Sequence, residues 1–356
     1  MPKWGKVYLV RRVIYNVTAK CNLHCRHCYA AELQGGVELS TDEALGVVEE
    51  VAKCFGKDTK LIFSGGEPLL REDIYDLIEH ASRLGLRASL ATNGTLITEQ
   101  VAEKLRKSGL TEVSISLDAA SPEIHDQIRG QGNFEKALEG LKACRRAGLE
   151  ILIDPCVFSF NVEQVLELLG LAEELGAKGL RIFHYIPMGR GKHELPSAQL
   201  TTAKYSEWLQ RLYNEQLRKP NISIYVTQTP QYTLLLAKGV ETGSSIASKM
   251  YEELKPGCRA GTHTLSIKHN GDVTPCPLWT TALGNLRSQS LREALNSELA
   301  RKLRDKQRYL KGKCADCIYV DVCGGCRVRA YQATGDYFSE DPLCSEVFYK
   351  PRGEEA

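Results

Sequence analysis

The sequence predicts an α/β protein built on a parallel sheet, either doubly wound or curled into a partial barrel of six strand-helix units. Two observations predict this fold class. Short β-branched runs alternate with amphipathic segments from residue 10 to residue 190, and glycines follow the amphipathic segments where helices should end. Because parallel strands bring their C-terminal ends to one edge, we expect the functional residues at that edge.

Six short runs are the expected strands, because they are rich in β-branched and aromatic residues. They lie at 13–15, 61–63, 88–90, 113–116, 151–153 and 180–183. Among the intervening helices the clearest start is at Ser40, which can form a capping box with Glu43. A later helix is expected at about 202–217, with its aromatic face against the sheet. The small and polar residues 241–249 are expected to form an exposed loop.

The chain has 356 residues, which suits one large domain and a smaller one. We expect a core over 1–192, a bridging helical region over 193–257 and a cysteine-rich domain over 258–348. The last range holds seven of the thirteen cysteines and little continuous apolar patterning. A small domain of that composition is expected to be organised by metal.

Charge and composition exclude several classes of partner. The 46 basic and 44 acidic residues nearly balance, so no overall field favours nucleic acid or an anionic membrane surface. We find neither a signal peptide nor an apolar run of about eighteen residues, which predicts a cytoplasmic protein with no membrane partner. In that reducing compartment, closely spaced thiols are expected to be metal ligands rather than disulfides.

Three cysteines, Cys21, Cys25 and Cys28, follow directly on the first expected strand. Three thiolates leave one iron of a 4Fe-4S cube without a protein ligand, and that iron can bind a small chelating molecule. Two alternatives remain: His24 and His27 could join the thiols around zinc, or the thiols could be structural. A structural zinc site usually has four closed ligands, brought by two separated pairs.

The pattern Cys-x-x-x-Cys-x-x-Cys, followed by Tyr29, resembles the signature loop of the radical S-adenosylmethionine (SAM) superfamily. The resemblance covers roughly residues 10–190 and implies a partial (β/α)6 barrel. It implies that a 4Fe-4S cluster on the three cysteines reductively cleaves SAM, giving a 5'-deoxyadenosyl radical that abstracts hydrogen from the substrate. It also implies a reducing partner such as ferredoxin or flavodoxin.

The same resemblance assigns SAM contacts to the ends of the second, third and fourth expected strands and to one arginine. The glycine turn after the second strand would receive the methionine amino group, and the arginine would pair with the methionine carboxylate. The residues assigned in this way, together with Tyr29, are Gly65, Gly66, Glu67, Pro68, Asn93, Ser116, Asp118 and Arg129. For Asn93, Ser116 and Asp118, ordinary turn chemistry at strand ends is the alternative.

The C-terminal cysteines resemble the seven-cysteine SPASM extension, which carries two auxiliary 4Fe-4S clusters. The resemblance assigns a complete distal cluster to Cys314, Cys317, Cys323 and Cys344, and a proximal cluster to Cys258, Cys276 and Cys326. Two residues separate Cys323 from Cys326, where the common pattern has three. Residues 259–262 contain no eighth cysteine, so the proximal cluster is expected to have an open iron or a non-cysteine ligand.

Zinc is the alternative for the C-terminal cysteines. Cys314, Cys317, Cys323 and Cys326 form two pairs five residues apart, which could hold one ion. The three remaining cysteines, Cys54, Cys144 and Cys156, are expected to be buried core thiols.

The tail from Cys323 to Cys344 is similar to enzymes of the alternative haem pathway, which oxidatively decarboxylate propionates of iron-coproporphyrin, and to their relatives acting on sirohaem derivatives. That similarity implies a porphyrin as the small-molecule substrate. Basic residues would meet its carboxylates near the barrel mouth. The candidates by position are Arg181, His184, Arg190, Lys192 and His193, with a solvated basic loop as the alternative.

Two other functions stay open. One is a maturase of the same superfamily that modifies a ribosomally made precursor peptide. About a dozen residues precede the first strand, so a leader-binding module is expected to come from a separate partner. The other is an iron-sulfur electron-transfer protein without SAM chemistry, against which the glycine turn counts.

Overall fold

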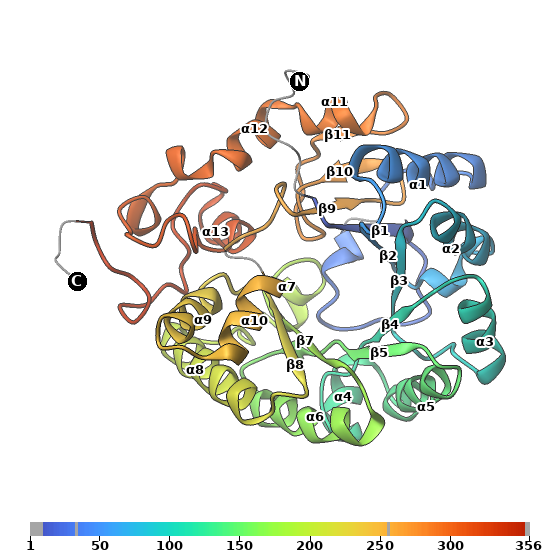
Figure 1. The fold of residues 1–356 in the computed structure, drawn as a ribbon, viewed down its shortest axis with the longest axis horizontal. Coiled ribbons are helices and arrows are strands. Elements are labelled where there is room, and N and C mark those ends of the chain that lie inside the picture. Colours follow the sequence, from blue (N-terminus) through green and yellow to red (C-terminus); the bar gives the residue numbers. More distant parts are fainter. Residues whose placement is uncertain (1–9, 33–34, 255–256, 353–356) are drawn as a thin grey trace.

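The computed structural model describes residues 10–32, 35–254 and 257–352. A long curved sheet dominates it, and helices cover the outer side of the curve (Figure 1). Its first strands run in the order β1, β2, β3, β4, β5 and β7, and every neighbouring pair among them is parallel. The sheet is therefore curled into a partial barrel rather than doubly wound.

All six expected strands are present. They are β1 (Arg12–Thr18), β2 (Lys60–Gly65), β3 (Arg87–Thr92), β4 (Glu112–Ile115), β5 (Glu150–Ile153) and β7 (Gly179–His184). Two strands that the sequence analysis did not single out extend the far edge, because β6 (Cys156–Val157) and β8 (Ser223–Thr227) both pair with β7.

The helices of the barrel follow the strands in chain order. They are α1 (Thr41–Phe55), α2 (Ile74–Arg83), α3 (Glu99–Lys107), α4 (Pro122–Arg129), α5 (Asn133–Arg146), α6 (Val162–Leu175) and the short α7 (Gly191–Glu194). Two 3-10 turns, η1 (Tyr29–Glu32) and η2 (Pro68–Leu70), lie at the sheet edge. Helix α1 has the expected capping box of Ser40 with Glu43, which satisfies the first free amides of the helix.

Three helices follow α7 in the chain: α8 (Thr202–Arg218), α9 (Tyr232–Glu241) and α10 (Ser245–Leu254). Helix α8 confirms the expected helix and buries Tyr205 and Trp208 against the sheet. Of the expected loop at 241–249, only residues 242–244 lie outside helices, because Glu241 ends α9 and Ser245 begins α10. Its polar residues form the first turns of α10, which exists because Ala247 and Met250 recur at helical spacing and are buried.

The C-terminal segment continues the sheet at the β1 edge. Strand β9 (Thr264–Ile267) pairs with β1 in parallel, β10 (Asp272–Thr274) pairs with β9 in antiparallel, and β11 (Gly284–Asn285) follows β10. Because these strands join the sheet of the core, the division into three domains stays a prediction.

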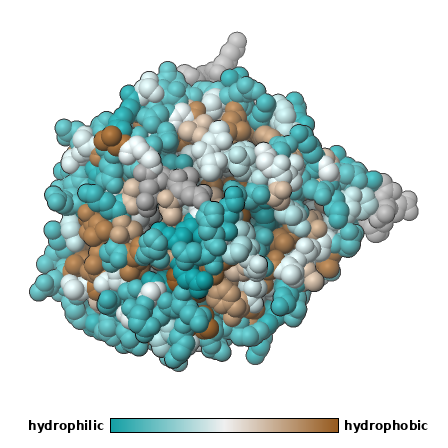
Figure 2. All heavy atoms as spheres, turned by 180° about the vertical axis from the view of Figure 1, so that it is seen from behind, coloured by the Kyte–Doolittle hydropathy of each residue, from teal (hydrophilic) through white to brown (hydrophobic). Residues whose placement is uncertain are grey.

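The remaining elements, α11 (Leu291–Leu295), α12 (Glu298–Arg304), η3 (Lys306–Arg308), η4 (Gly312–Cys314) and α13 (Arg327–Thr334), complete the C-terminal segment. Figure 1 shows α13 between the β1 edge of the sheet and helices α8 to α10. Hydrophobic and hydrophilic side chains are interspersed on the face seen in Figure 2. Within the described ranges, no helix combines the length and apolar content that crossing a bilayer requires.

Candidate functional site

The loop of the first three cysteines leaves β1 at the C-terminal edge of the sheet and is held by backbone contacts on two sides. The Arg26 amide donates to the Ile128 carbonyl at 2.9 Å. The Arg190 guanidinium donates to the Cys25 carbonyl at 2.7 Å, and its amide donates to the Cys28 carbonyl at 3.0 Å. The loop is therefore fixed by the segment after β7, far away in the sequence.

The three thiols lie close enough to influence one another. Cys21 is exposed, whereas Cys25 and Cys28 are partly buried. Burial raises the pKa of Cys25 to about 11, and the nearby Cys28 and Cys21 thiols raise it as well. Metal binding must therefore displace protons from this site, because the thiolate is the ligand.

The histidines of the loop do not complete a zinc site. His24 is exposed. The His27 ring instead packs edge-on against Phe158, with 5.4 Å between the ring centroids. Its Nε2 lies 3.5 Å from an Arg129 nitrogen. In the described part of the chain, no three Cys, His, Asp or Glu side chains converge on a single ion. A 4Fe-4S cube spreads its thiolates over separate irons, so this donor set fits the cube better than zinc.

The glycine turn after β2 lies directly against the cysteine loop. The Gly66 amide donates to the Thr18 carbonyl and the Glu67 amide to the Lys20 carbonyl, both at 2.8 Å. A Cβ on Gly66 would collide with the Lys20 carbonyl oxygen, and Gly65 has φ +146°. Only glycines allow this close approach of two backbones.

Glu67 is fully buried and its carboxylate is already satisfied by the protein. It accepts hydrogen bonds from the Thr92 hydroxyl at 2.8 Å, the Asn93 amide at 2.9 Å and the Leu69 amide at 3.1 Å. The Glu67 side chain therefore connects the turn to the end of β3, while Pro68 opens η2.

Asn93 joins the end of β3 to the cysteine loop. Its side-chain nitrogen donates to Oδ1 of Asn22 at 2.8 Å, and its own Oδ1 accepts from the Thr95 amide at 2.9 Å. Asn22 is a loop residue that the sequence analysis did not single out. Nothing in its spacing could have identified it, because the contact spans 71 residues of chain.

Asp118 and Arg129 form a buried ion pair beside the loop. The Arg129 Nε and Nη2 atoms donate to the two Asp118 oxygens at 2.6 and 3.2 Å, and the Cys156 amide donates to Oδ1 at 2.8 Å. Burial alone would raise the pKa of Asp118, but the Arg129 charge prevails and holds it at about 2. Much of the Arg129 charge is thus neutralised within the protein.

Two further residues assigned by resemblance lie at the same edge. Ser116 is half-buried just after β4, and its amide donates to the Thr92 carbonyl at 3.1 Å. Tyr29, Cys258 and Cys276 pack against one buried cluster, which includes Cys326. Burial raises the pKa of its phenol, and the thiols of Cys28 and Cys276 act in the same direction. Tyr29 therefore lies between the first cysteine group and the C-terminal ones.

The seven C-terminal cysteines fall into two groups. Desolvation raises the pKa of the partly buried Cys276, and the nearby Cys258 and Cys326 thiols raise it further. A separate pocket is lined by the other four cysteines, together with Gly324 and Gly325. These four cysteines are Cys314, Cys317, Cys323 and Cys344. The structure thus brings together the same two sets that the resemblance assigns to the proximal and distal clusters.

A buried ion pair lies between these two cysteine groups. The Asp341 carboxylate accepts hydrogen bonds from Nε of Arg329 at 2.6 Å and from Nη2 at 2.7 Å. It also accepts one from the Cys326 amide at 2.7 Å. Gln231 of the core donates to the same carboxylate at 3.0 Å. The pair was not identified from sequence, because only the fold places 231, 326 and 341 together.

Of the other cysteines, Cys144 and Cys156 are buried as expected. Cys54, in the last turn of α1, is only partly buried. The expectation of a basic barrel mouth was wrong for two residues. Arg181 is buried in an ion pair with Asp154. His184 is buried against α8 and accepts a hydrogen bond from the Trp208 indole at 2.8 Å.

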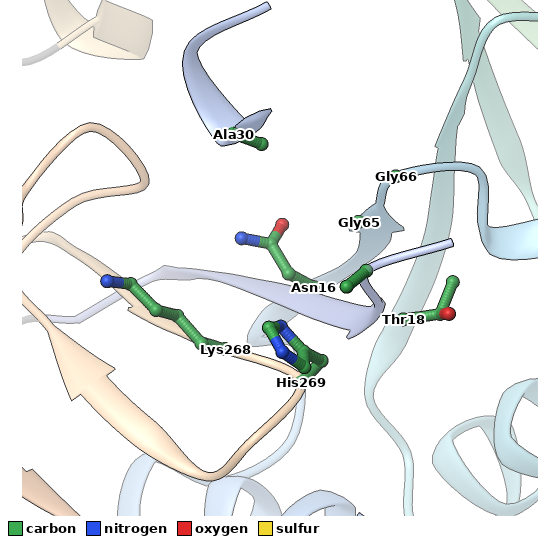
Figure 3. A pocket seen from close by; sticks show the side chains of 8 residues that line it. Asn16, Thr18, Ala30, Gly65, Gly66, Lys268 and His269 are labelled. Carbon is green, nitrogen blue, oxygen red and sulfur yellow. The ribbon is translucent and has the colours of Figure 1, made fainter. Parts of the chain in front are cut away.

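A pocket opens at the C-terminal ends of β1 and β2, beside the glycine turn (Figure 3). Asn16, Thr18, Ala19, Ala30, Gly65 and Gly66 of the core line it, together with Lys268 and His269 of the turn between β9 and β10. The last two residues carry no motif and were missed. The parallel pairing of β9 with β1 brings them to this edge.

Comparison with known proteins follows the same division of the chain. Residues 15–172 match the model of the radical SAM superfamily, and residues 258–318 match the SPASM iron-sulfur cluster-binding domain. The chain is 40% identical to the AdoMet-dependent heme synthase of Methanosarcina barkeri, over 96% of this chain and 97% of that protein. It is 30% identical to the mycofactocin maturase MftC of Mycolicibacterium smegmatis, over 95% and 83%.

Solved structures share the fold. SuiB of Streptococcus suis, bound to its precursor peptide SuiA, superposes with a TM-score of 0.74 at 18% identity, covering 96% of this chain and 76% of that one. The protein anSMEcpe with bound AdoMet superposes with a TM-score of 0.72 at 21% identity, covering 94% and 93%. The cysteine loop, the matched family models and the full-length likeness show that this chain belongs to the radical SAM superfamily, as an enzyme with a SPASM domain that binds SAM and 4Fe-4S clusters.

Proposed function

We propose that this enzyme oxidatively decarboxylates the propionate side chains of an iron-coproporphyrin to form haem. The observation that carries the proposal is the 40% identity to an AdoMet-dependent heme synthase over nearly the whole length of both chains. The likeness includes the C-terminal segment, where the auxiliary clusters lie, as well as the core.

The proposed ligand sets follow the grouping of the thiols. Cys21, Cys25 and Cys28 would hold the cluster that cleaves SAM, and the open iron would take the SAM methionine group. The proximal auxiliary cluster would lie on Cys258, Cys276 and Cys326, and the distal one on Cys314, Cys317, Cys323 and Cys344. The zinc alternative needs Cys326 together with Cys314, Cys317 and Cys323. Those three cysteines line a pocket with Cys344, and Cys326 is not part of its lining, which counts against a shared zinc ion.

The remaining site residues are proposed to position SAM. Gly65 and Gly66 bring backbone groups close to the loop, while Glu67 and Asn93 hold the turn and the loop to the end of β3. Asp118 holds Arg129 beside Cys25. Bound SAM and the first cluster together would supply a 5'-deoxyadenosyl radical, and an auxiliary cluster would supply an acceptor for one electron. Conversion of one propionate to a vinyl group releases carbon dioxide. It also removes one hydrogen atom, which the radical would take, and one electron, which a cluster would take.

The experiment is anaerobic incubation of the reconstituted protein with SAM, reductant and iron-coproporphyrin III, followed by mass analysis of the porphyrin. Loss of two carboxyl groups is the expected result. Unchanged porphyrin, with no shift in the visible spectrum on mixing, would refute the proposal. A cytoplasmic ferredoxin or flavodoxin is the proposed physiological reductant, and the faster product formation with either protein than with dithionite would support it.

Peptide maturation is the second candidate. It is favoured by the 30% identity to MftC and by the fold shared with SuiB, which was solved with a precursor peptide. The lower identity places it behind the porphyrin reaction. An electron-transfer protein without SAM chemistry would form no 5'-deoxyadenosine from SAM under reducing conditions. Detection of that product would therefore exclude this function.

A further inference from the structure

The turn between β9 and β10 places Lys268 and His269 in the lining of the pocket at the C-terminal ends of β1 and β2, called the core pocket below. In the parallel pairing of β1 with β9, Tyr15 lies opposite Ile267. The next residue on each strand, Asn16 and Lys268, therefore reaches the same edge of the sheet. Figure 3 shows Lys268 and His269 across from Asn16 and the glycine turn.

These three side chains are buried, and Asn16 and His269 each carry a polar atom that the described protein leaves without a hydrogen bond. Asn16 is 8% exposed, Lys268 is 7% exposed and His269 is 4% exposed. Oδ1 of Asn16 and Nε2 of His269 have no hydrogen-bond partner in the described structure. The Lys268 ammonium forms no ion pair with any described carboxylate. Such groups are costly to bury without partners, which indicates that a ligand supplies them.

The turn is held rigidly. The Lys268 amide donates to the Asp272 carbonyl at 2.8 Å, and the Gly271 amide donates back to the Lys268 carbonyl at 2.9 Å. The His269 carbonyl accepts the Leu39 amide at 2.8 Å. The backbone of Lys268 and His269 therefore does not need to be ordered when a ligand enters, which favours binding.

We propose that Lys268, with His269 and Asn16 beside it, forms a subsite that binds a carboxylate of the substrate. An ammonium pairs with a carboxylate by a charge-assisted hydrogen bond, and imidazole and amide groups can supply further hydrogen bonds. The inference rests on the proposed function, because it assigns the subsite to a porphyrin propionate. It also gives a role to two side chains of the SPASM segment that are not cysteine ligands.

The methionine end of SAM carries a carboxylate as well, so the same chemistry has two possible sources. Position favours the substrate. Gly65 and Gly66 line the same pocket, but Figure 3 shows the Lys268 side chain extending away from both glycines. The Cys276 thiol of the proposed proximal cluster is near enough to Lys268 to influence its pKa. Arg129, in contrast, lies beside Cys25 of the first cluster loop.

The test compares three variants of the full-length, anaerobically reconstituted protein. Lys268→Gln removes the charge, Lys268→Arg retains it, and Lys238→Gln removes a charge from the exposed face of α9 as a control. Iron-coproporphyrin III and its tetramethyl ester are titrated by absorbance, and SAM binding is measured by equilibrium dialysis. Iron content and circular dichroism show whether each variant is folded and loaded.

For Lys268→Gln we expect the dissociation constant of iron-coproporphyrin III to rise about 10- to 100-fold, as for loss of one charged hydrogen bond. Binding of the ester and of SAM should be unchanged, and Lys268→Arg should retain most of the affinity. Equal porphyrin affinity in folded Lys268→Gln and wild type would overturn the inference and leave the proposed function intact.

Two other outcomes also decide the question. If Lys268→Gln weakens SAM binding but not porphyrin binding, the subsite belongs to the SAM carboxylate and the assignment to substrate is wrong. If the wild-type protein binds no iron-coproporphyrin, the proposed function and the inference fail together. If Lys268→Gln does not fold, the affinities of the wild-type protein for iron-coproporphyrin III and for its tetramethyl ester are compared instead. Equal affinities would exclude a carboxylate subsite.

Discussion

Asp118 illustrates how one buried carboxylate organises the neighbourhood of the cysteine loop. Its carboxylate accepts two hydrogen bonds from the Arg129 guanidinium and a third from the Cys156 amide. Removal of one partner from such a pair leaves the other charge buried without compensation. We therefore expect Asp118→Asn to lower the free energy of unfolding by about 3–5 kcal/mol in urea denaturation followed by circular dichroism.

The matched control is Glu163→Gln, which removes an exposed partner of Arg211 at 2.7 Å. Exposed pairs contribute at most about 1 kcal/mol. A similar loss for both variants would show that Asp118 has no special role in stability.

The pH dependence of the same residue has a defined sign. The folded-state pKa of Asp118 is about 2, below its usual value of 3.8. Its contribution to stability is therefore complete above about pH 4 and is lost as the pH falls through 2. Between pH 4 and pH 2 the unfolding free energy of Asp118→Asn should fall less steeply than that of the wild type, and parallel curves would contradict the assignment.

At the scale of elements, the contact between the glycine turn and the cysteine loop depends on the absence of a Cβ. Gly66→Ala would force the turn away from the Lys20 carbonyl and displace the loop. We expect this variant to lose iron from the first cluster while the auxiliary clusters stay loaded, as measured by iron analysis and electron paramagnetic resonance.

Gly170→Ala in α6 is the control for Gly66→Ala, since a Cβ there meets no atom within 4 Å. In a helix that change should leave cluster loading unaltered and raise stability by about 0.5–1 kcal/mol. Full iron loading of Gly66→Ala would show that the close approach is not required.

At the scale of the whole molecule, the structure separates the first cysteine loop from the distal group, with Tyr29 and the proximal group between them. Cys28→Ala should therefore abolish formation of 5'-deoxyadenosine from SAM, whereas Cys344→Ala should retain part of it. Product analysis by liquid chromatography measures both. Equal loss in two folded variants would argue against separate roles for the clusters.

The sequence alone was sufficient for the features that local patterns encode. The strands β1 to β5 and β7 follow from β-branched runs, the start of α1 follows from Ser40 and Glu43, and the cysteine spacing identified the superfamily. These features depend on neighbours within a few residues, so periodicity and spacing reveal them.

Tertiary structure decided what depends on contacts between distant segments. Pairing of β9 with β1 carries Lys268 and His269 into the core pocket, and Asp341 meets Gln231 and Cys326 only in the folded chain. His184 looked available from its position at the end of β7, yet α8 covers it. A sequence pattern records the face on which a residue lies, but burial and ion pairing depend on which element packs against that face.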